Sequence, residues 1–287
     1  MRKIFVLFCF MPVFLQAQLL YEISGNGSAN KSYLLATNKF VSMAFLDTIP
    51  NVYKCFDKCD KVVCEFVMED YQALSALRQA ALLPDTIKLE SLYSKKELEQ
   101  IDQALQRTLE MRLEQFYRIK PSYLTELYRN ELMKQWLDYD EKNTMENAFQ
   151  WLAQTKNMPV YGLDDVGETL YMIFDREPMQ WQAKELLNII ENPEKEVRQE
   201  RTIREMYLYG RLYDIAFQIY SPDNQTVISY SDYQVFIKRN TQWIKRLQPY
   251  LKDGKAFITL NAMYLGGDEG LIAQLKKAGY RVRAVNR

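Results

Sequence analysis

The chain has 287 residues, with 37 basic and 37 acidic side chains and no histidine. A formal net charge of zero provides no attraction toward phosphate backbones, so we expect no nucleic-acid partner. Without histidine, Ser-His-Asp catalysis, Cys-His catalysis and histidine-ligated metal sites are excluded. Because 48% of the residues are hydrophobic and 13% are aromatic, the chain can bury a sizeable core and does not belong to the disordered class.

The first residues have the pattern of a secretory signal peptide. Arg2 and Lys3 precede an apolar run over residues 4–15, and the small residue Ala17 follows it. The run is shorter than the roughly 20 apolar residues that span a bilayer. We therefore expect residues 1–17 to be removed and the mature chain to be periplasmic or extracellular, with no integral membrane segment.

Short β-rich segments at both ends of the chain predict strands. The residues Gly25, Asn26 and Gly27 have turn propensity and join the first two segments into a hairpin. The third segment is an apolar run that Glu65 interrupts after Lys61, and the fourth follows Pro159. The expected strands, in chain order, are residues 19–24, 32–37, 61–68, 160–163, 256–260 and 280–285.

Helical periodicity dominates the middle of the chain. Ser94 followed by Glu97 predicts a capping box, after which apolar residues continue at helical spacing as far as Phe116. The helical pattern stops at Pro222, Asp223 and Asn224, and Gly279 provides a C-cap for the last helix. The expected helices are 51–59, 94–116, 122–136, 145–156, 181–190, 194–220 and 270–278.

The order of these elements predicts one α+β (mixed α/β) domain. Its central sheet would combine N-terminal, middle and C-terminal strands, with a large helical insertion between them. The last strand, helix and strand are expected to form a compact βαβ-like unit.

Three cysteines, Cys55, Cys59 and Cys64, would remain after cleavage of the signal peptide. In an oxidising compartment, an odd number allows one disulfide and one free thiol, and a Cys59–Cys64 or Cys55–Cys64 bridge would join a helix to the next strand. Alternatively, all three are small buried hydrophobic side chains. Their irregular spacing and the lack of histidine do not support a zinc site.

Five segments occur in order along the chain: LLYEISGNGSANKSYLLATNKF, DKVVCEFVMED, MPVYGLDDV, FIKRNTQWIKRLQPYL and FITLNAMYLGGDEGLIAQLKKAGYRV. Together they resemble the TraB/GumN (TraB/PrgY) family over residues 19–285. The family's characteristic glutamate matches Glu65, its Gly-Leu-Glu segment places Asp164 at the acid, and its Arg-Asn helix matches Arg239 and Asn240. The resemblance implies one TraB/GumN-like domain over residues 18–287, with the helical insertion at about 85–155 and 176–230.

The chain departs from that family at the residues that carry its chemistry. The Tiki Wnt-cleaving proteases of the family are taken as metal-dependent hydrolases that use two G-x-x-H motifs and a glutamate. Here the motifs read ATNK at residues 36–39 and NAMY at residues 261–264, so that lysine and tyrosine replace the histidines. The resemblance therefore implies the fold, but neither a metal cofactor nor family-type metalloprotease activity.

The resemblance implies that the two motif ends and Glu65 converge on one pocket. In this hypothesis the Lys39 ammonium replaces a metal ion as the counter-ion of Glu65, and Tyr264 donates a hydrogen bond. The other pocket candidates are Asn38, Asp164, Arg239, Asn240 and Asn261. In the alternative, Lys39 and Asn38 are solvated loop residues, Tyr264 is a packing residue, and Glu65 points to solvent from a half-exposed strand.

We interpret the chain as an exported, catalytically degenerate binding or interaction protein whose ligand is an unknown protein or peptide. A rival interpretation is a metal-independent hydrolase, with Glu65 as base and Lys39 or Tyr264 as acid or electrostatic stabiliser. A Ca or Mg site on the carboxylates Glu65 and Asp164 is a lesser variant, disfavoured by the charge of Lys39. In a third interpretation, the helices dock a partner and the pocket is inert.

Overall fold

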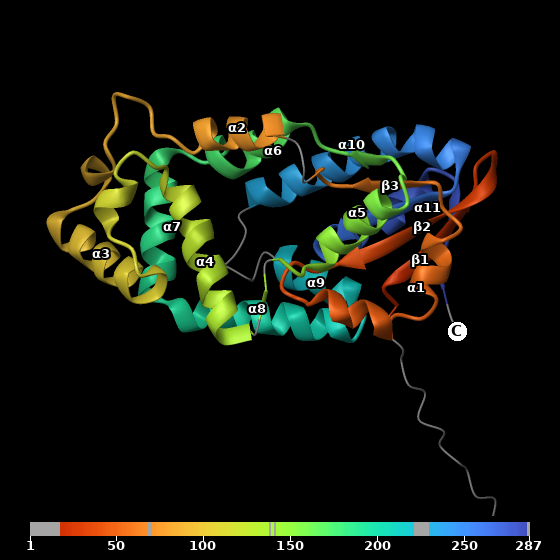
Figure 1. Ribbon diagram of the computed structural model, residues 1–287, viewed down its shortest axis with the longest axis horizontal. Coiled ribbons are helices and arrows are strands. Elements are labelled where there is room, and N and C mark those ends of the chain that lie inside the picture. The colour runs from red at the N-terminus through yellow and green to blue at the C-terminus, as the bar shows by residue number, and fades with distance from the viewer. Residues whose placement is uncertain (1–17, 68–70, 138, 141, 221–229, 286–287) are drawn as a thin grey trace, which may run out of the picture.

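The computed structural model describes residues 18–67, 71–137, 139–140, 142–220 and 230–285, and within them a mixed six-stranded sheet joins the N-terminal and C-terminal parts of the chain (Figure 1). The strands are β1 (Leu20–Gly25), β2 (Ser28–Thr37), β3 (Lys61–Cys64), β4 (Val160–Gly162), β5 (Ala256–Asn261) and β6 (Tyr280–Ala284), in the spatial order β4-β3-β5-β2-β1-β6. Strands β4, β3, β5 and β2 are parallel, whereas β1 is antiparallel to both its neighbours. The four parallel strands therefore end at one edge of the sheet, the edge at which open α/β sheets bind ligands.

The expected hairpin and the expected α+β class are confirmed. Gly25, Asn26 and Gly27 all have positive φ angles, of 85°, 51° and 82°, which permit the tight turn between β1 and β2. The C-terminal βαβ-like unit differs from the expectation, because β6 pairs with β1 and not with β5. The β1–β2 hairpin lies between them, so helix α11 (Leu271–Lys277) has to carry the chain across two strands.

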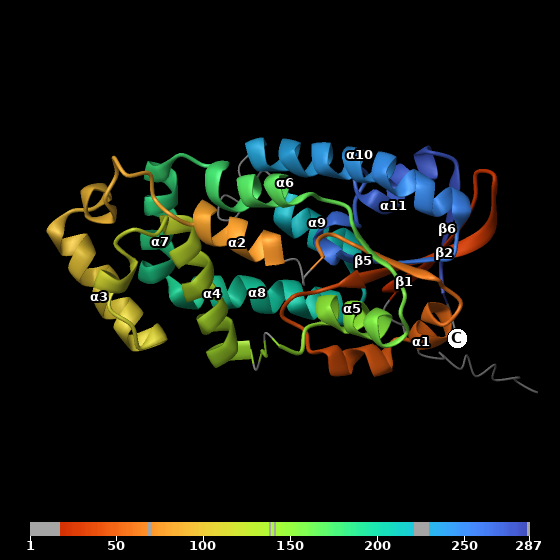
Figure 2. The same cartoon turned by 45° about the horizontal axis from the view of Figure 1, so that its top comes forward.

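Helices cover both faces of the sheet. In Figures 1 and 2, α10 (Tyr230–Asp253) lies on one side of the strands, whereas α1 (Val52–Phe56) and α5 (Met145–Thr155) lie on the other. The rings of Phe56 in α1 and Phe149 in α5 pack on Phe257 of β5, at centroid distances of 5.3 and 4.4 Å. Although α5 falls within the expected helical insertion, it belongs to the core of the sheet.

A second core lies at the other end of the elongated molecule (Figure 1). It is formed mainly by α3 (Lys95–Leu109), α4 (Pro121–Leu137) and α7 (Met179–Glu191), with contributions from α8 (Pro193–Leu208). Helix α8 then leads back to the sheet, where its Tyr207 is completely buried and donates a hydrogen bond to the carbonyl oxygen of Ala36 at 2.8 Å. This bond fixes the helical end of the molecule to the end of β2.

The remaining helical segments are short. They are α2 (Tyr71–Ala80), α6 (Val166–Leu170), a π-helical turn (Tyr171–Asp175), α9 (Leu212–Tyr220) and 3-10 turns at Met43–Thr48, Leu89–Leu92, Leu113–Phe116 and Ala262–Tyr264.

Several element boundaries differ from the sequence-based prediction for identifiable reasons. The capping box of Ser94 and Glu97 is present, but α3 ends before Glu110, whose φ of 57° is left-handed. The single helix expected over 194–220 is two helices, because Gly210 has a φ of 67°. Strand β3 is shorter than the expected strand over 61–68, because it ends at Cys64. The next residue, Glu65, lies at the edge of the sheet where the parallel strands end.

Some predictions concern residues outside the described ranges. The signal peptide at 1–17 and the helix-breaking residues Pro222, Asp223 and Asn224 are among them. Across the ranges that are described, no helix has both the length and the apolar character needed to cross a membrane.

Candidate functional site

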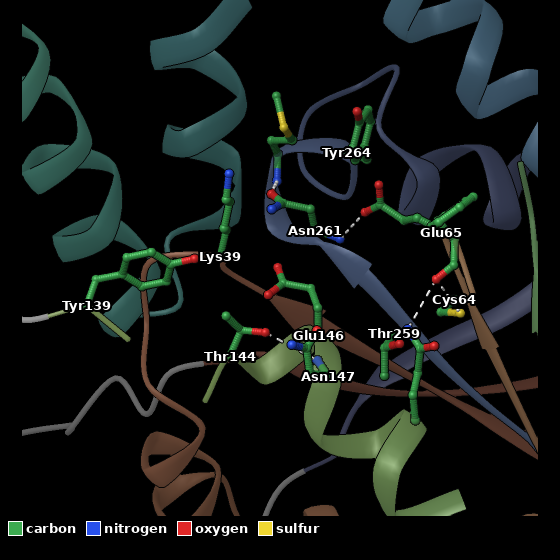
Figure 3. Close-up of a pocket in the computed structure, with 13 residues that line it drawn as sticks. Lys39, Cys64, Glu65, Tyr139, Thr144, Glu146, Asn147, Thr259, Asn261 and Tyr264 are labelled. Carbon is green, nitrogen blue, oxygen red and sulfur yellow. Dashed lines mark hydrogen bonds between the residues drawn. The ribbon is translucent and has the colours of Figure 1, made fainter. Parts of the chain in front are cut away.

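A cavity of about 420 Å³ lies at the C-terminal edge of the parallel strands, beside the first turn of α5 (Figure 3). Residues that follow β2, β3 and β5 line it, and four of the pocket candidates expected from the sequence are among them: Lys39, Glu65, Asn261 and Tyr264. The topology explains their convergence, because parallel strands end side by side. The other candidates, Asn38, Asp164, Arg239 and Asn240, do not line this cavity.

Glu65 is held in place by two protein groups. One carboxylate oxygen, Oε1, accepts a hydrogen bond from the backbone N–H of Asn261 at 2.7 Å (Figure 3). The other, Oε2, lies 3.4 Å from Nη2 of Arg239. Burial raises the pKa of Glu65, and this effect outweighs the opposing influence of Arg239 and the Asn261 N–H. Both oxygens of Glu65 are therefore occupied by groups of the protein itself.

Arg239 enters from α10 and is the centre of a buried ionic cluster. Its Nε donates to Oδ2 of Asp164 at 2.9 Å, Nη2 also bonds to that carboxylate, and Nη1 donates to the phenol oxygen of Tyr264. The guanidinium carbon lies 4.4 Å from the ring centroid of Trp243 and 4.6 Å from that of Tyr264. Trp243 in turn donates from Nε1 to Oδ1 of Asp164 at 2.6 Å. All three guanidinium nitrogens are thus engaged, and the cluster forms a fixed wall behind the cavity.

A second arginine, Arg246, extends this cluster to the start of α6. It binds Glu168 through two hydrogen bonds of 2.5 and 2.6 Å, donates to the carbonyl oxygen of Leu163 at 2.6 Å, and lies 3.6 Å from Asp164. Because only 6% of the Asp164 side chain is exposed, its charge depends on the two arginines for compensation.

Asparagines shape the turns around the cavity. Asn240 donates from Nδ2 to the carbonyl oxygens of Tyr264 and Glu269, at 3.1 and 3.3 Å, which fixes the turn after β5. Asn261 caps the same turn by accepting from the N–H of Met263. Asn38 is buried and its side chain accepts from the N–H of Phe40, so it shapes the turn after β2.

The expected ion pair between Lys39 and Glu65 is wrong. Within the described ranges, Lys39 pairs with Glu126 of α4, at 3.7 Å, and its amine lies 5.3 Å from the ring centroid of Phe40. In Figure 3 its side chain extends away from Glu65, and 41% of it is exposed. The cation that reaches Glu65 is Arg239, which approaches from α10 on the other side. The role expected of Tyr264 also changes, because its oxygen accepts a hydrogen bond from Arg239.

Glu146 is a cavity residue that the sequence analysis did not identify. It lies in the first turn of α5, and its carboxyl group points into the middle of the cavity (Figure 3). Burial, together with the nearby charge of Glu65, raises the pKa of Glu146 to about 7, although its own backbone N–H, the Thr37 hydroxyl and the Lys39 ammonium oppose the shift. The helix start at Thr144 was predictable, but an acidic residue in a first turn is favourable in any helix and does not indicate a pocket.

The partner of Lys39 belongs to a second ionic cluster, centred on Arg129 of α4. Arg129 bonds to Glu126, to Glu196 at 2.7 Å and to Glu185 at 3.4 Å. Burial raises the pKa of the nearby Glu200 to about 7. Carboxylates outnumber cations in this cluster.

No disulfide joins Cys59 and Cys64, because all three described cysteines are free. The Cys59 thiol donates back to the carbonyl oxygen of Cys55 at 3.3 Å, and the Cys64 thiol donates to that of Phe66 at 3.2 Å. Burial raises the pKa of Cys59 and of Cys64 to about 12. Both thiols remain protonated at neutral pH and are poor nucleophiles or metal ligands.

The donor groups at the cavity do not fit a divalent metal ion of the kind used by family hydrolases. The Arg239 guanidinium lies between the carboxylates of Glu65 and Asp164, so a second cation there would be repelled. Across the part of the chain that the structure describes, no group of three or more cysteine, aspartate and glutamate side chains could hold a metal ion. The chemistry of the cavity is therefore assigned to its protein groups.

Comparison with known proteins gives one match. The model of the TraB/PrgY/gumN family matches residues 19–284, nearly the whole chain, and confirms the resemblance found in the five sequence segments. No curated protein and no solved structure matches the chain.

Proposed function

Because this chain belongs to the TraB/PrgY/gumN family but lacks histidine, we propose that it is an exported binding or interaction protein without metal-dependent hydrolysis. The observation that carries this proposal is the state of Glu65, whose two oxygens meet the Asn261 N–H at 2.7 Å and Arg239 at 3.4 Å. A general base needs a carboxylate directed at a water or substrate proton, whereas these two contacts direct the Glu65 carboxylate at groups of the protein. Glu65 is used instead to hold the cavity wall in place.

The cavity supports a binding role by its size and lining. A volume of about 420 Å³ lies within the range of small-ligand sites, roughly 300–1,000 Å³. The side chains of Phe66, Tyr139 and Met263 provide apolar surface, and the Glu146 carboxyl group is the polar group that points into the middle of the cavity. Such a lining is typical of a pocket that orients a ligand through few polar contacts. Export is supported by the N-terminal charge and hydrophobicity pattern alone.

The test combines metal analysis of the purified mature protein with a peptidase screen, run with and without a chelator. We expect no stoichiometric divalent metal and no chelator-sensitive cleavage. One equivalent of metal per chain together with chelator-sensitive cleavage would overturn the proposal. A Glu65→Gln variant provides the control, since it should change neither measurement.

A metal-independent hydrolase is a second candidate, favoured by one observation. The carboxyl group of Glu146 has a pKa raised to about 7 and faces the cavity, as general acid-base catalysis at neutral pH requires. The earlier assignment of Lys39 or Tyr264 as the acid has less support, because Lys39 pairs with Glu126 and Tyr264 with Arg239. Chelator-resistant cleavage that Glu146→Gln abolishes would favour this second candidate.

A further inference from the structure

The cavity contains two carboxyl groups with different surroundings. Glu65 has both oxygens engaged, by Asn261 and Arg239. The backbone N–H of Glu146 and the Thr37 hydroxyl both lower the pKa of its carboxyl group, but Thr37 Oγ1 is a buried atom without a hydrogen-bond partner in the described ranges. Among the described side chains, no lysine or arginine nitrogen lies within ion-pair distance of Glu146. Its carboxyl group therefore faces the cavity without a counter-ion.

From this arrangement we propose that the cavity binds a primary ammonium group on an apolar body, with Glu146 as the counter-ion. The assignment rests on the binding function proposed above and adds the ligand class to it. An anionic ligand would face both Glu146 and Glu65, and a neutral one would leave Glu146 without charge compensation. A cation satisfies Glu146 and reduces its repulsion with Glu65.

The charges around Glu146 come from three elements. Glu65 follows β3, Lys39 follows β2, and the buried phenol of Tyr207 approaches from α8. Lys39 does not take the place of a ligand cation, because its amine lies 3.7 Å from Glu126 and points away from Glu146 (Figure 3). The Tyr207 hydroxyl donates a hydrogen bond to the Ala36 carbonyl oxygen, and burial raises its pKa, so that it remains neutral. The cavity therefore has a net negative charge once Glu146 is ionised.

The geometry favours an ammonium over a guanidinium. A guanidinium binds best when both carboxylate oxygens are free for paired, parallel hydrogen bonds. The Glu146 backbone N–H and the Thr37 hydroxyl already act on this carboxylate, and both lower its pKa. A compact ammonium needs one free oxygen only. Phe66, Tyr139 and Met263 would then surround the apolar body of the ligand.

A primary ammonium group could come from a small arylalkylamine or from a lysine side chain of an exported peptide. Calorimetric titration of the mature protein with four probes separates these sources. The probes are 2-phenylethylamine, its neutral analogue 2-phenylethanol, the anion 3-phenylpropionate and Nα-acetyl-lysine amide. We expect the amine to bind at least about tenfold more tightly than the alcohol, as one charge-assisted hydrogen bond implies, and the anion not to bind. Tighter binding of the lysine derivative than of 2-phenylethylamine would identify peptides as the source, and the reverse order would identify small amines.

Two variants and a control assign the effect to Glu146. Glu146→Gln should weaken amine binding at least about tenfold, and Glu146→Asp should weaken it less, because the charge is kept. Glu205→Gln makes the same chemical change at an exposed position of α8 and should leave binding unchanged. Because the ionised form of Glu146 binds the cation, affinity for the amine should rise about tenfold from about pH 6 to about pH 8, and Glu146→Gln should remove this dependence.

A measurement on the unmodified protein keeps the proposal testable if Glu146→Gln does not fold. Amine binding just below neutral pH should release protons, visible as a dependence of the binding enthalpy on the ionisation enthalpy of the buffer. The proposal is overturned if the alcohol binds as tightly as the amine, if neither amine probe binds, or if binding releases no proton. These outcomes leave the broader binding function intact, whereas chelator-sensitive cleavage with bound metal would overturn that function whatever the amine results.

Discussion

The two ends of the molecule each bury an arginine among carboxylates, but they balance its charge differently. At the sheet, Arg239 packs against the rings of both Trp243 and Tyr264 and binds Asp164, whose side chain is 6% exposed. In the helical core, Arg129 binds only glutamates, and two of these, Glu126 and Glu185, are 42% and 53% exposed.

The comparison indicates where charge is fixed and where it can adapt. If Arg239 is lost, Asp164 stays buried with only the more distant Arg246 nearby, so its desolvation is poorly compensated. If Arg129 is lost, its glutamates can rotate toward water. The cluster of Arg239 therefore supports the cavity wall rigidly. The cluster of Arg129 joins helices and should tolerate the loss of its arginine better.

The largest expected effect follows removal of the arginine at the sheet. Arg239→Met should lower the free energy of unfolding by about 3–5 kcal/mol, the usual cost of leaving a buried charge unpaired. Urea denaturation followed by circular dichroism measures this loss. A loss below that of the matched variant Arg129→Met would contradict the contrast between the two clusters.

The next effect concerns the pH dependence of stability. Because the pKa of Glu146 is raised to about 7 in the folded state, the folded protein binds a proton more tightly than the unfolded chain. This group therefore costs stability as pH rises from the carboxyl pKa of the unfolded chain, about 4.3, through about 7. Glu146→Gln should increase the free energy of unfolding at about pH 8 by about 1–3 kcal/mol and flatten its slope between about pH 5 and 7.

Unfolding curves of the wild type and Glu146→Gln at a series of pH values test this prediction. Glu205→Gln, at an exposed position, should reproduce the wild-type slope. An unchanged slope in Glu146→Gln would show that folding does not raise the pKa of Glu146, and would contradict this prediction.

A smaller effect is expected in the helical core. Arg129→Met should cost about 1–2 kcal/mol, because the partly exposed glutamates regain water when the cation is removed. The loss should decrease at mildly acidic pH, at which Glu200, whose pKa burial raises to about 7, becomes neutral. Thermal unfolding at about pH 5.5 and about pH 8 measures the difference; a larger loss at the lower pH would contradict it.

The smallest effect is expected at the residue that links the cavity to the helical core. Lys39→Met removes an ion pair in which both side chains are more than 40% exposed, so the cost should be within about 0.5 kcal/mol. The same denaturation assay measures it. If Lys39→Met lowered the free energy of unfolding as much as Arg239→Met, Lys39 would be a main counter-ion of the cavity carboxylates, and the prediction would be contradicted.

The sequence predicted the local structure and the general position of the site. Two β-rich segments joined by the Gly25–Gly27 turn indicated the hairpin, and Ser94 with Glu97 indicated the start of α3. The family resemblance implied that the motif ends Lys39 and Tyr264 converge with Glu65, and all three line the cavity. These features depend on short-range patterns or on the order of the strands.

The three-dimensional pairing of charges could not be predicted in the same way. Lys39 and Arg239 are both near the edge of the sheet, and only the direction from which α10 approaches decides which of them reaches Glu65. Glu146 was missed because its place in the first turn of a helix has an ordinary explanation. The break at Gly210 was missed because apolar residues continue at helical spacing on both sides of it.

The account depends most on the claim that protein groups, and not a metal ion, hold Glu65. A crystal structure of the mature protein, grown with excess zinc or manganese and measured at the metal absorption edge, tests this directly. We predict the Glu65 carboxylate against the Arg239 guanidinium and the Asn261 N–H, with no anomalous scattering in the cavity. A divalent ion within about 2.0–2.6 Å of a Glu65 oxygen, with Arg239 displaced, would contradict the account.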